Sequence, residues 1–128
     1  MKVVRVLIVD DESQTADTLS KIISLMLDWP LETEVCRTGE AAFEYLDLKP
    51  FDVLITDGQL PDMSGLALTL QAHKRFPDMK IVYMTATPVA EIEEKVRMVA
   101  DIFIKKPFPA SMLAAQLQGL LQEKVSVG

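Results

Sequence analysis

The sequence opens, after Met1-Lys2, with the apolar run Val3-Val4-Arg5-Val6-Leu7-Ile8-Val9, which ends in two carboxylates, Asp10 and Asp11. An apolar run of this kind, rich in β-branched residues, is typical of a parallel strand that is covered on both faces. Four more strand-like runs follow along the chain, and together the five predict a parallel sheet. These four are Glu34 to Arg37, Val53 to Thr56, Lys80 to Met84 and Ile102 to Ile104.

Segments with helical spacing separate these runs. Apolar residues three and four positions apart predict amphipathic helices with one buried side. Three stripes are clear: Leu19, Ile22, Ile23, Met26 and Leu27; Val89, Ile92, Val96 and Val99; and Leu113, Leu117, Leu120 and Leu121. Weaker helices are expected from about Glu40 to Leu48 and from about Leu66 to Arg75. Alternation of strand and helix predicts a doubly wound α/β fold with a five-stranded parallel sheet and right-handed crossovers.

Composition narrows the function classes. The 128 residues, 49% of them hydrophobic, suit a single domain spanning residues 1–128. Cys36 is the only cysteine, so we expect a buried thiol rather than a disulfide or a zinc cluster. A net charge of −6 argues against direct binding of nucleic acid, which requires a basic surface. With no signal-peptide pattern and no apolar stretch of membrane-spanning length, we expect a cytoplasmic protein without a membrane partner.

Polar residues follow four of the predicted strands. Asp10 and Asp11 follow the first, Asp57 the third and Thr85 the fourth, and Lys106 lies just beyond the fifth. Because parallel strands all end at the same edge of the sheet, and ligands bind outside those ends, these side chains are expected to form one site.

The charges in this site suggest its chemistry. Three carboxylates that lie 4 Å apart repel each other by about 4 kcal/mol per pair at an effective dielectric near 20. Lys106 can offset one negative charge, and Mg²⁺ suits the remainder because it prefers oxygen ligands and accepts phosphate. Thr85 and Lys106 offer the donors that a phosphoryl group requires. Asp57 is then the candidate nucleophile, which would form an acyl phosphate.

Four motifs in this order resemble the receiver domain of two-component response regulators, over essentially the whole chain. They are Val6-Leu7-Ile8-Val9-Asp10-Asp11-Glu12, Asp52-Val53-Leu54-Ile55-Thr56-Asp57 with Pro61 and Gly65 after it, Met84-Thr85-Ala86, and Lys106-Pro107-Phe108. The resemblance implies a flavodoxin-like (βα)5 fold with strand order 2-1-3-4-5, an order that chemotaxis receivers exemplify. It also implies a role in phosphorelay signalling.

The resemblance assigns the acceptor and the metal ligands. Asp57 would be the phosphoacceptor, and Asp11 would bind Mg²⁺ directly. Asp10 would bind the ion through water, and Gln59 would contribute its backbone carbonyl. A donor of the phosphoryl group, either a histidine kinase or a phosphotransfer protein, is implied as the first partner.

The resemblance also assigns the switch. Thr85 and Lys106 would hold the phosphoryl oxygens, and Phe103 would change rotamer as Thr85 is drawn toward the phosphate. A cis peptide bond is expected before Pro107. The surface of the fourth and fifth helices would then bind a downstream protein or an output domain outside this sequence. A phosphorylation-dependent homodimer is one arrangement that the resemblance leaves open.

The sequence departs from the family pattern at Val99, where a glycine is usual, so we do not expect the fourth helix to end in a left-handed residue. Gln59 and Thr87 occupy positions that tune the lifetime of the phosphoryl group in this family.

Plainer interpretations compete for individual residues. Asp10 and Asp11 would also suit a helix N-cap, Lys106 a solvated surface and Phe103 the core. Asp52 and Asp62 are interpreted as turn residues, and the single histidine, His73, as a surface or packing residue.

Two other functions remain open. The first is a receiver-shaped interaction module that works without phosphorylation. The second is a Mg²⁺-dependent phosphohydrolase, although Asp57-Gly58-Gln59 lacks the second aspartate that such haloacid-dehalogenase-like enzymes carry two positions on. A nucleotide-binding fold is disfavoured, since Asp10-Asp11-Glu12 stands where a glycine-rich phosphate loop would be needed.

Overall fold

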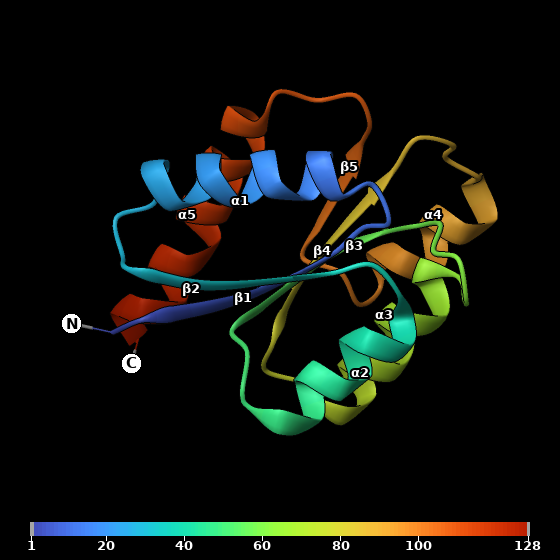
Figure 1. The fold of residues 1–128 in the computed structure, drawn as a ribbon, viewed down its shortest axis with the longest axis horizontal. Helices are drawn as coiled ribbons and strands as arrows, with labels where there is room; N and C mark the ends of the chain where they lie inside the picture. Colours follow the sequence, from blue (N-terminus) through green and yellow to red (C-terminus); the bar gives the residue numbers. More distant parts are fainter. Residues whose placement is uncertain (1, 128) are drawn as a thin grey trace.

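The computed structural model describes the backbone of residues 2–127 and the side chains of residues 2–122. Strands and helices alternate along this part of the chain (Figure 1). In chain order they are β1 (Val4–Val9), α1 (Ser13–Met26), β2 (Leu31–Cys36), α2 (Gly39–Leu48), β3 (Val53–Asp57), α3 (Gly65–Arg75), β4 (Lys80–Thr85), α4 (Ala90–Arg97), β5 (Ile102–Lys105) and α5 (Ala110–Val127). None of these helices is both long enough and apolar enough to cross a bilayer.

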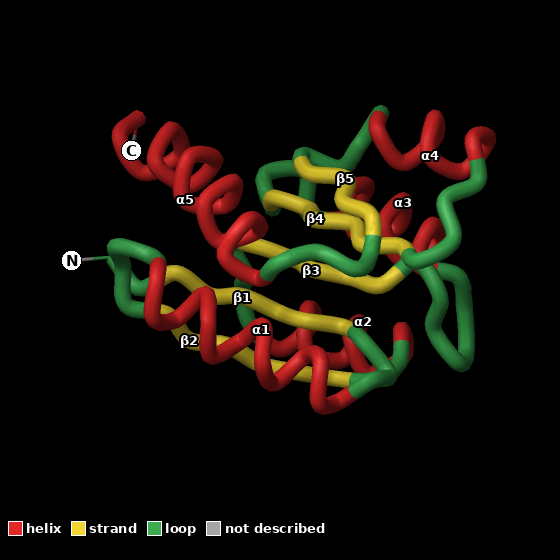
Figure 2. The backbone as a smooth tube through the Cα atoms, turned by 90° about the horizontal axis from the view of Figure 1, so that it is seen from above, coloured by secondary structure: helices red, strands yellow, loops and turns green. Residues whose placement is uncertain are grey.

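The strands form one parallel, five-stranded sheet in the order β2-β1-β3-β4-β5, which confirms the predicted flavodoxin-like fold (Figure 2). The register pairs Val9 of β1 with Thr56 of β3, and Asp57 of β3 with Met84 of β4. β1, β3 and β4 therefore end side by side, and the residues that follow them meet at one edge of the sheet.

Each face of the sheet is covered by its own set of helices. α1 and α5 pack on one face and α2, α3 and α4 on the other (Figures 1 and 2). Ile8 and Ile55 belong to the core under α1 and α5, whereas Leu7 and Leu54 belong to the core under α2 and α3. Neighbouring residues of β1 and β3 are thus buried on opposite faces, which explains why their sequences are continuously apolar.

The α4 stripe was predicted incorrectly. Only Val96 of its four members is fully buried, while Val89 and Ile92 are 49% and 37% exposed. The helix is only eight residues long, so Val89 precedes it and Val99 lies beyond its end. Among the described residues no residue other than glycine has a positive φ, so α4 does not end in a left-handed residue, as expected from Val99.

Two further differences concern the sheet edge and α1. β2 begins three residues before the predicted run, at Leu31, and most of it is only half buried because it lies at the edge of the sheet. In α1 the buried residues include Ala16, whereas Met26 is 47% exposed.

Candidate functional site

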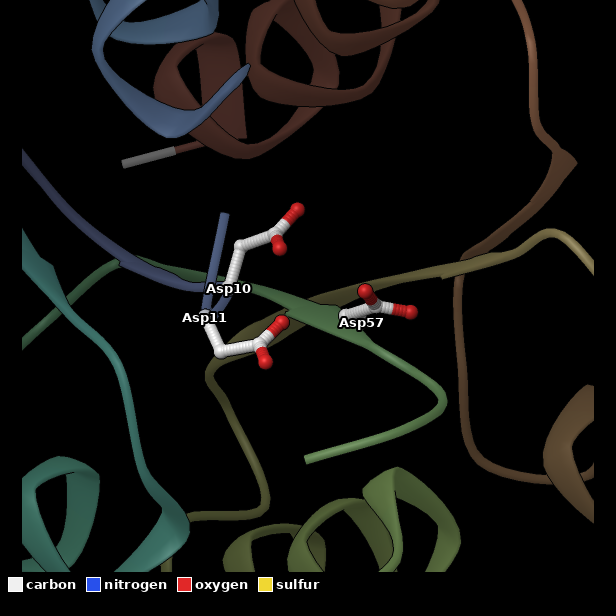
Figure 3. Close-up of side chains that lie close together, drawn as sticks. All are labelled: Asp10, Asp11 and Asp57. Atoms are coloured by element: carbon white, nitrogen blue, oxygen red, sulfur yellow. The ribbon is translucent and has the colours of Figure 1, made fainter. Parts of the chain in front are cut away.

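Three carboxylates meet at the carboxyl edge of the sheet. Asp10 directly follows β1, Asp11 comes next, and Asp57 is the last residue of β3. One oxygen from each can be chosen so that all three oxygens lie within 4.8 Å of one another (Figure 3). Asp10 is fully buried and Asp57 is 8% exposed, whereas Asp11 is exposed. Such a set of hard oxygen donors, open on one side, is suited to a divalent cation such as Mg²⁺.

Lys106 extends from the end of β5 into this cluster. Its ammonium donates to Asp10 Oδ2 at 2.9 Å and to Asp57 Oδ2 at 3.1 Å. Its backbone N–H donates to the Thr85 carbonyl at 2.8 Å, which ties its position to the end of β4. Burial alone would lower the pKa of Lys106, but the two carboxylates outweigh that effect and raise it. The side chain is therefore charged, and it offsets only part of the charge of the three acids.

The structure brings together most of the predicted site residues around one shallow cavity of about 240 Å³. Asp11, Asp57, Gln59 and Lys106 line it. The Gln59 backbone N–H donates to Asp57 Oδ1 at 3.3 Å, so this residue borders Asp57 directly. The peptide bond between Lys106 and Pro107 is cis, as the resemblance implied.

Thr85 is buried at the end of β4 but lines a neighbouring, smaller cavity of about 80 Å³ together with Phe103. Its hydroxyl accepts a hydrogen bond from the Thr87 backbone N–H at 3.2 Å. The Gln59 side chain reaches the same loop, since its Nε2 donates to Thr87 Oγ1 at 3.1 Å. Gln59 lines both cavities, which therefore adjoin where the loops that follow β3 and β4 come into contact.

Tyr83 is a feature of this site that the sequence analysis did not identify. Its ring stacks on Phe103, with centroids 5.6 Å apart and planes at 13°. Its hydroxyl lies at Gly58, where a Cβ would approach it to 2.6 Å. Burial first, and the charge of Asp57 second, raise the pKa of Tyr83. The only available sequence signal was Gly58 itself, a residue without a side chain directly after Asp57.

The structure also tests the plainer interpretations of single residues. The N-cap of α1 is Glu12, so the interpretation of Asp10 and Asp11 as that cap is wrong. Asp10 Oδ1 instead accepts from the Glu12 backbone N–H at 3.0 Å. Lys106 is not a solvated surface residue, because it bonds two acids of the cluster. His73 lies in the last turn of α3.

The comparisons with known proteins agree with this geometry. The sequence model of the response regulator receiver domain matches residues 6–118. The transcriptional regulatory protein CitT of Halalkalibacterium halodurans is 28% identical over an alignment of 132 positions, which covers 99% of this chain and 56% of that protein. The transcriptional regulatory protein TrcR of Mycobacterium tuberculosis is 31% identical over 121 residues, or 93% of this chain and 46% of that protein. The chain thus spans about half the length of these relatives.

Solved structures give the same result. A CheY-like response regulator receiver domain protein from Methanospirillum hungatei superposes with a TM-score of 0.87 at 27% identity, covering 99% of this chain and 100% of that one. The BeF3-activated DrrB receiver domain superposes with a TM-score of 0.80 at 24% identity, covering 94% of this chain and 99% of that one. The second likeness supports the fold alone.

Proposed function

This chain belongs to the response regulator receiver domain family, and from that premise we propose that it accepts a phosphoryl group on Asp57 from a histidine kinase or a phosphotransfer protein. The observation that carries the proposal is the position of the Lys106 ammonium, which bonds both Asp10 and Asp57. A cation held at the acceptor carboxylate is well placed to contact the oxygens of an arriving phosphoryl group, where negative charge is concentrated.

The donor set supports Mg²⁺ as the cofactor. Asp10, Asp11 and Asp57 offer carboxylate oxygens close together, and Gln59 borders Asp57 with its backbone. By the family pattern Asp11 would bind the ion directly, Asp10 through water, and Gln59 through its carbonyl. When bound, Mg²⁺ supplies positive charge that offsets the carboxylates and draws the phosphoryl oxygens into the site.

The proposed phosphoryl transfer is a single displacement at phosphorus. A carboxylate oxygen of Asp57 forms a bond to phosphorus while the bond from phosphorus to the donor's imidazole nitrogen breaks. The electron pair of that bond stays on the imidazole, and no proton has to leave Asp57 because its carboxylate attacks as an anion. Lys106 and the hydroxyl of Thr85 would then hold the oxygens of the bound phosphoryl group.

We propose that phosphorylation is transmitted through the smaller cavity. Thr85 and Phe103 line it together with Val89 and Ile92, which lie at the start of α4. A movement of Thr85 toward the phosphoryl group would leave space for Phe103 and alter the surface formed by α4, β5 and α5. The exposed apolar side chains of Val89 and Ile92 support this surface as the place where a downstream protein or an output domain binds.

The rest of the proposal concerns the domain as a whole. We propose that residues 1–128 act as one regulatory domain in the cytoplasm, rather than as an enzyme with a separate substrate. The negative net charge favours a protein partner over direct contact with nucleic acid. A phosphorylation-dependent homodimer through the α4–α5 surface is one form that this partnership could take.

Intact-protein mass spectrometry after incubation with a small acyl phosphate tests the proposal. We expect a single phosphoryl adduct that requires Mg²⁺ and is absent from Asp57→Asn. Absence of both an adduct and turnover of the acyl phosphate would favour an interaction module that works without phosphorylation. Turnover that survives in Asp57→Asn would instead favour a phosphohydrolase with a different nucleophile.

A further inference from the structure

The loop of residues 58–64, between β3 and α3, is closed by its own contacts next to Asp57. Gly65 N–H donates to the Gly58 carbonyl at 2.9 Å, and Gln59 and Ser64 form an isolated β-bridge. A Cβ at Gly65 would collide with the backbone carbonyl oxygen of Asp57, so only glycine fits there. These contacts define the shape of the loop that carries Gln59. The inner end of the loop is held at the site, where the Gln59 backbone N–H donates to Asp57 Oδ1 and its Nε2 donates to Thr87 Oγ1.

The outer end of the same segment is fastened to α2. The two carboxylate oxygens of Asp62 accept from the backbone N–H groups of Gly39 and Glu40, each at 2.9 Å. These hydrogen bonds lower the pKa of Asp62. The Met63 side chain covers Gly39 so closely that a Cβ there would collide with it. Asp62 thus does more than form a turn, because it connects the loop to a helix 22 residues earlier in the chain.

The start of α2 is a firm point of attachment. The Thr38 hydroxyl accepts from the Ala41 N–H at 3.0 Å, and the Thr38 carbonyl accepts from the Ala42 N–H at 3.1 Å. With Asp62 on Gly39 and Glu40, the N–H groups of the first turn all have partners. Ala42 and Leu46 are buried in the core against the sheet, so α2 cannot shift without disturbing that core.

We infer that Asp62 is a positioning residue of the metal site, which holds the loop so that the Gln59 carbonyl faces the cation beside Asp57. This inference rests on the proposed function, since it concerns the Mg²⁺ site. Asp62 itself does not touch the metal. It acts by fixing one end of a short loop whose other end begins at the acceptor, and Gln59 lies only three residues before it.

A purely structural role for Asp62 would affect the stability of the fold and not the affinity for Mg²⁺. A helix cap contributes to the stability of α2, and its loss lowers the midpoint of unfolding without changing metal affinity in the folded protein. A positioning role changes the affinity for Mg²⁺ at a temperature where every variant is folded.

Isothermal titration of the full chain with Mg²⁺ alone distinguishes the two roles. The variants are Asp62→Ala, Asp62→Asn and a control, Glu44→Ala, which removes the same charge from an exposed position on α2. The titrations are run at high ionic strength, where the Debye length falls to about 3 Å in 1 M salt and distant charges are screened. Circular dichroism confirms that each variant is folded at the temperature used.

We expect Asp62→Ala to bind Mg²⁺ about tenfold more weakly, the lower end of what the loss of a supporting residue costs a metal site. Asp62→Asn should recover only part of the affinity, because its one amide oxygen can accept from only one of the two helix N–H groups. Glu44→Ala should bind like the wild type.

Equal affinity in Asp62→Ala and wild type would overturn the inference and leave the proposed function intact. The inference would also be wrong if Glu44→Ala weakened Mg²⁺ binding as much as Asp62→Ala, since the lost negative charge rather than the lost hydrogen bonds would then be responsible. Failure of the wild type to bind Mg²⁺ would instead overturn the proposed function, and with it the premise of the inference.

Discussion

The hydroxyl of Tyr83 occupies the space that a side chain at residue 58 would require, since a Cβ built at Gly58 lies 2.6 Å from that oxygen. The Tyr83 ring also stacks on Phe103. Gly58 is therefore packed against the aromatic pair that borders the proposed switch cavity.

Gly58→Ala should force Tyr83 to move. We expect a loss of about 1 to 3 kcal/mol in the free energy of unfolding, as overpacking of a core typically causes. Urea denaturation measures this loss. In a double-mutant cycle with Tyr83→Val, which removes the ring, the alanine should cost much less. Equal losses with and without the ring would show that the two positions are not coupled.

Lys106→Ala should destabilise the metal-free protein at neutral pH. It removes two charged hydrogen bonds and leaves the buried Asp10 beside other carboxylates, so we expect a loss of about 2 kcal/mol. The loss should shrink in the presence of Mg²⁺, whose positive charge would offset the same carboxylates. Urea denaturation with and without Mg²⁺ checks this, with the exposed neighbour Lys105→Ala as control. A loss that Mg²⁺ leaves unchanged would contradict the electrostatic account.

Because of Cys36, the free energy of unfolding should depend on pH in the alkaline range. Burial raises the pKa of its thiol from 9.0 to about 11. Because the native state keeps its proton to higher pH than the unfolded state, this contribution is complete below pH 9.0 and is lost as the pH rises through about 11. The free energy of unfolding should therefore fall less steeply in Cys36→Ala across this range. Parallel curves for the two proteins would show that the thiol is not responsible.

The two sides of α4 should respond differently to truncation. Val96→Ala removes fully buried methyl groups and should cost about 2 kcal/mol, whereas Glu94→Ala, at an exposed position, should change stability by no more than about 0.5 kcal/mol. Thermal or urea unfolding of the two variants gives the comparison. Similar losses would mean that α4 is packed on both sides.

The fold could be predicted from the sequence because β1 and β3 are buried on both faces, which leaves a continuous apolar signal. The edge strand β2 carried a weaker signal, since Glu32 and Glu34 interrupt it. For α4, the spacing of apolar residues could not show where the helix begins or ends, so Val89 and Val99 were assigned to a buried stripe that they do not share.

The site could be predicted only in part. The rule that parallel strands end together was sufficient to place Asp10, Asp57 and Lys106 in contact. The rule could not predict that Thr85 lines a separate, adjoining cavity, because the position of this cavity depends on how the loop after β4 turns. The contacts of Asp62 and Tyr83 were not predicted, since neither residue stands at the end of a strand, where this rule applies.

The central claim, that Asp57 is the acceptor, is tested most directly by reductive trapping. The chain is phosphorylated with a small acyl phosphate and Mg²⁺, treated with borohydride, which reduces an aspartyl phosphate to homoserine, and digested for peptide mass spectrometry. The account predicts homoserine at position 57 and unmodified aspartate at Asp10 and Asp11. Homoserine at Asp10 or Asp11 with none at position 57 would contradict it.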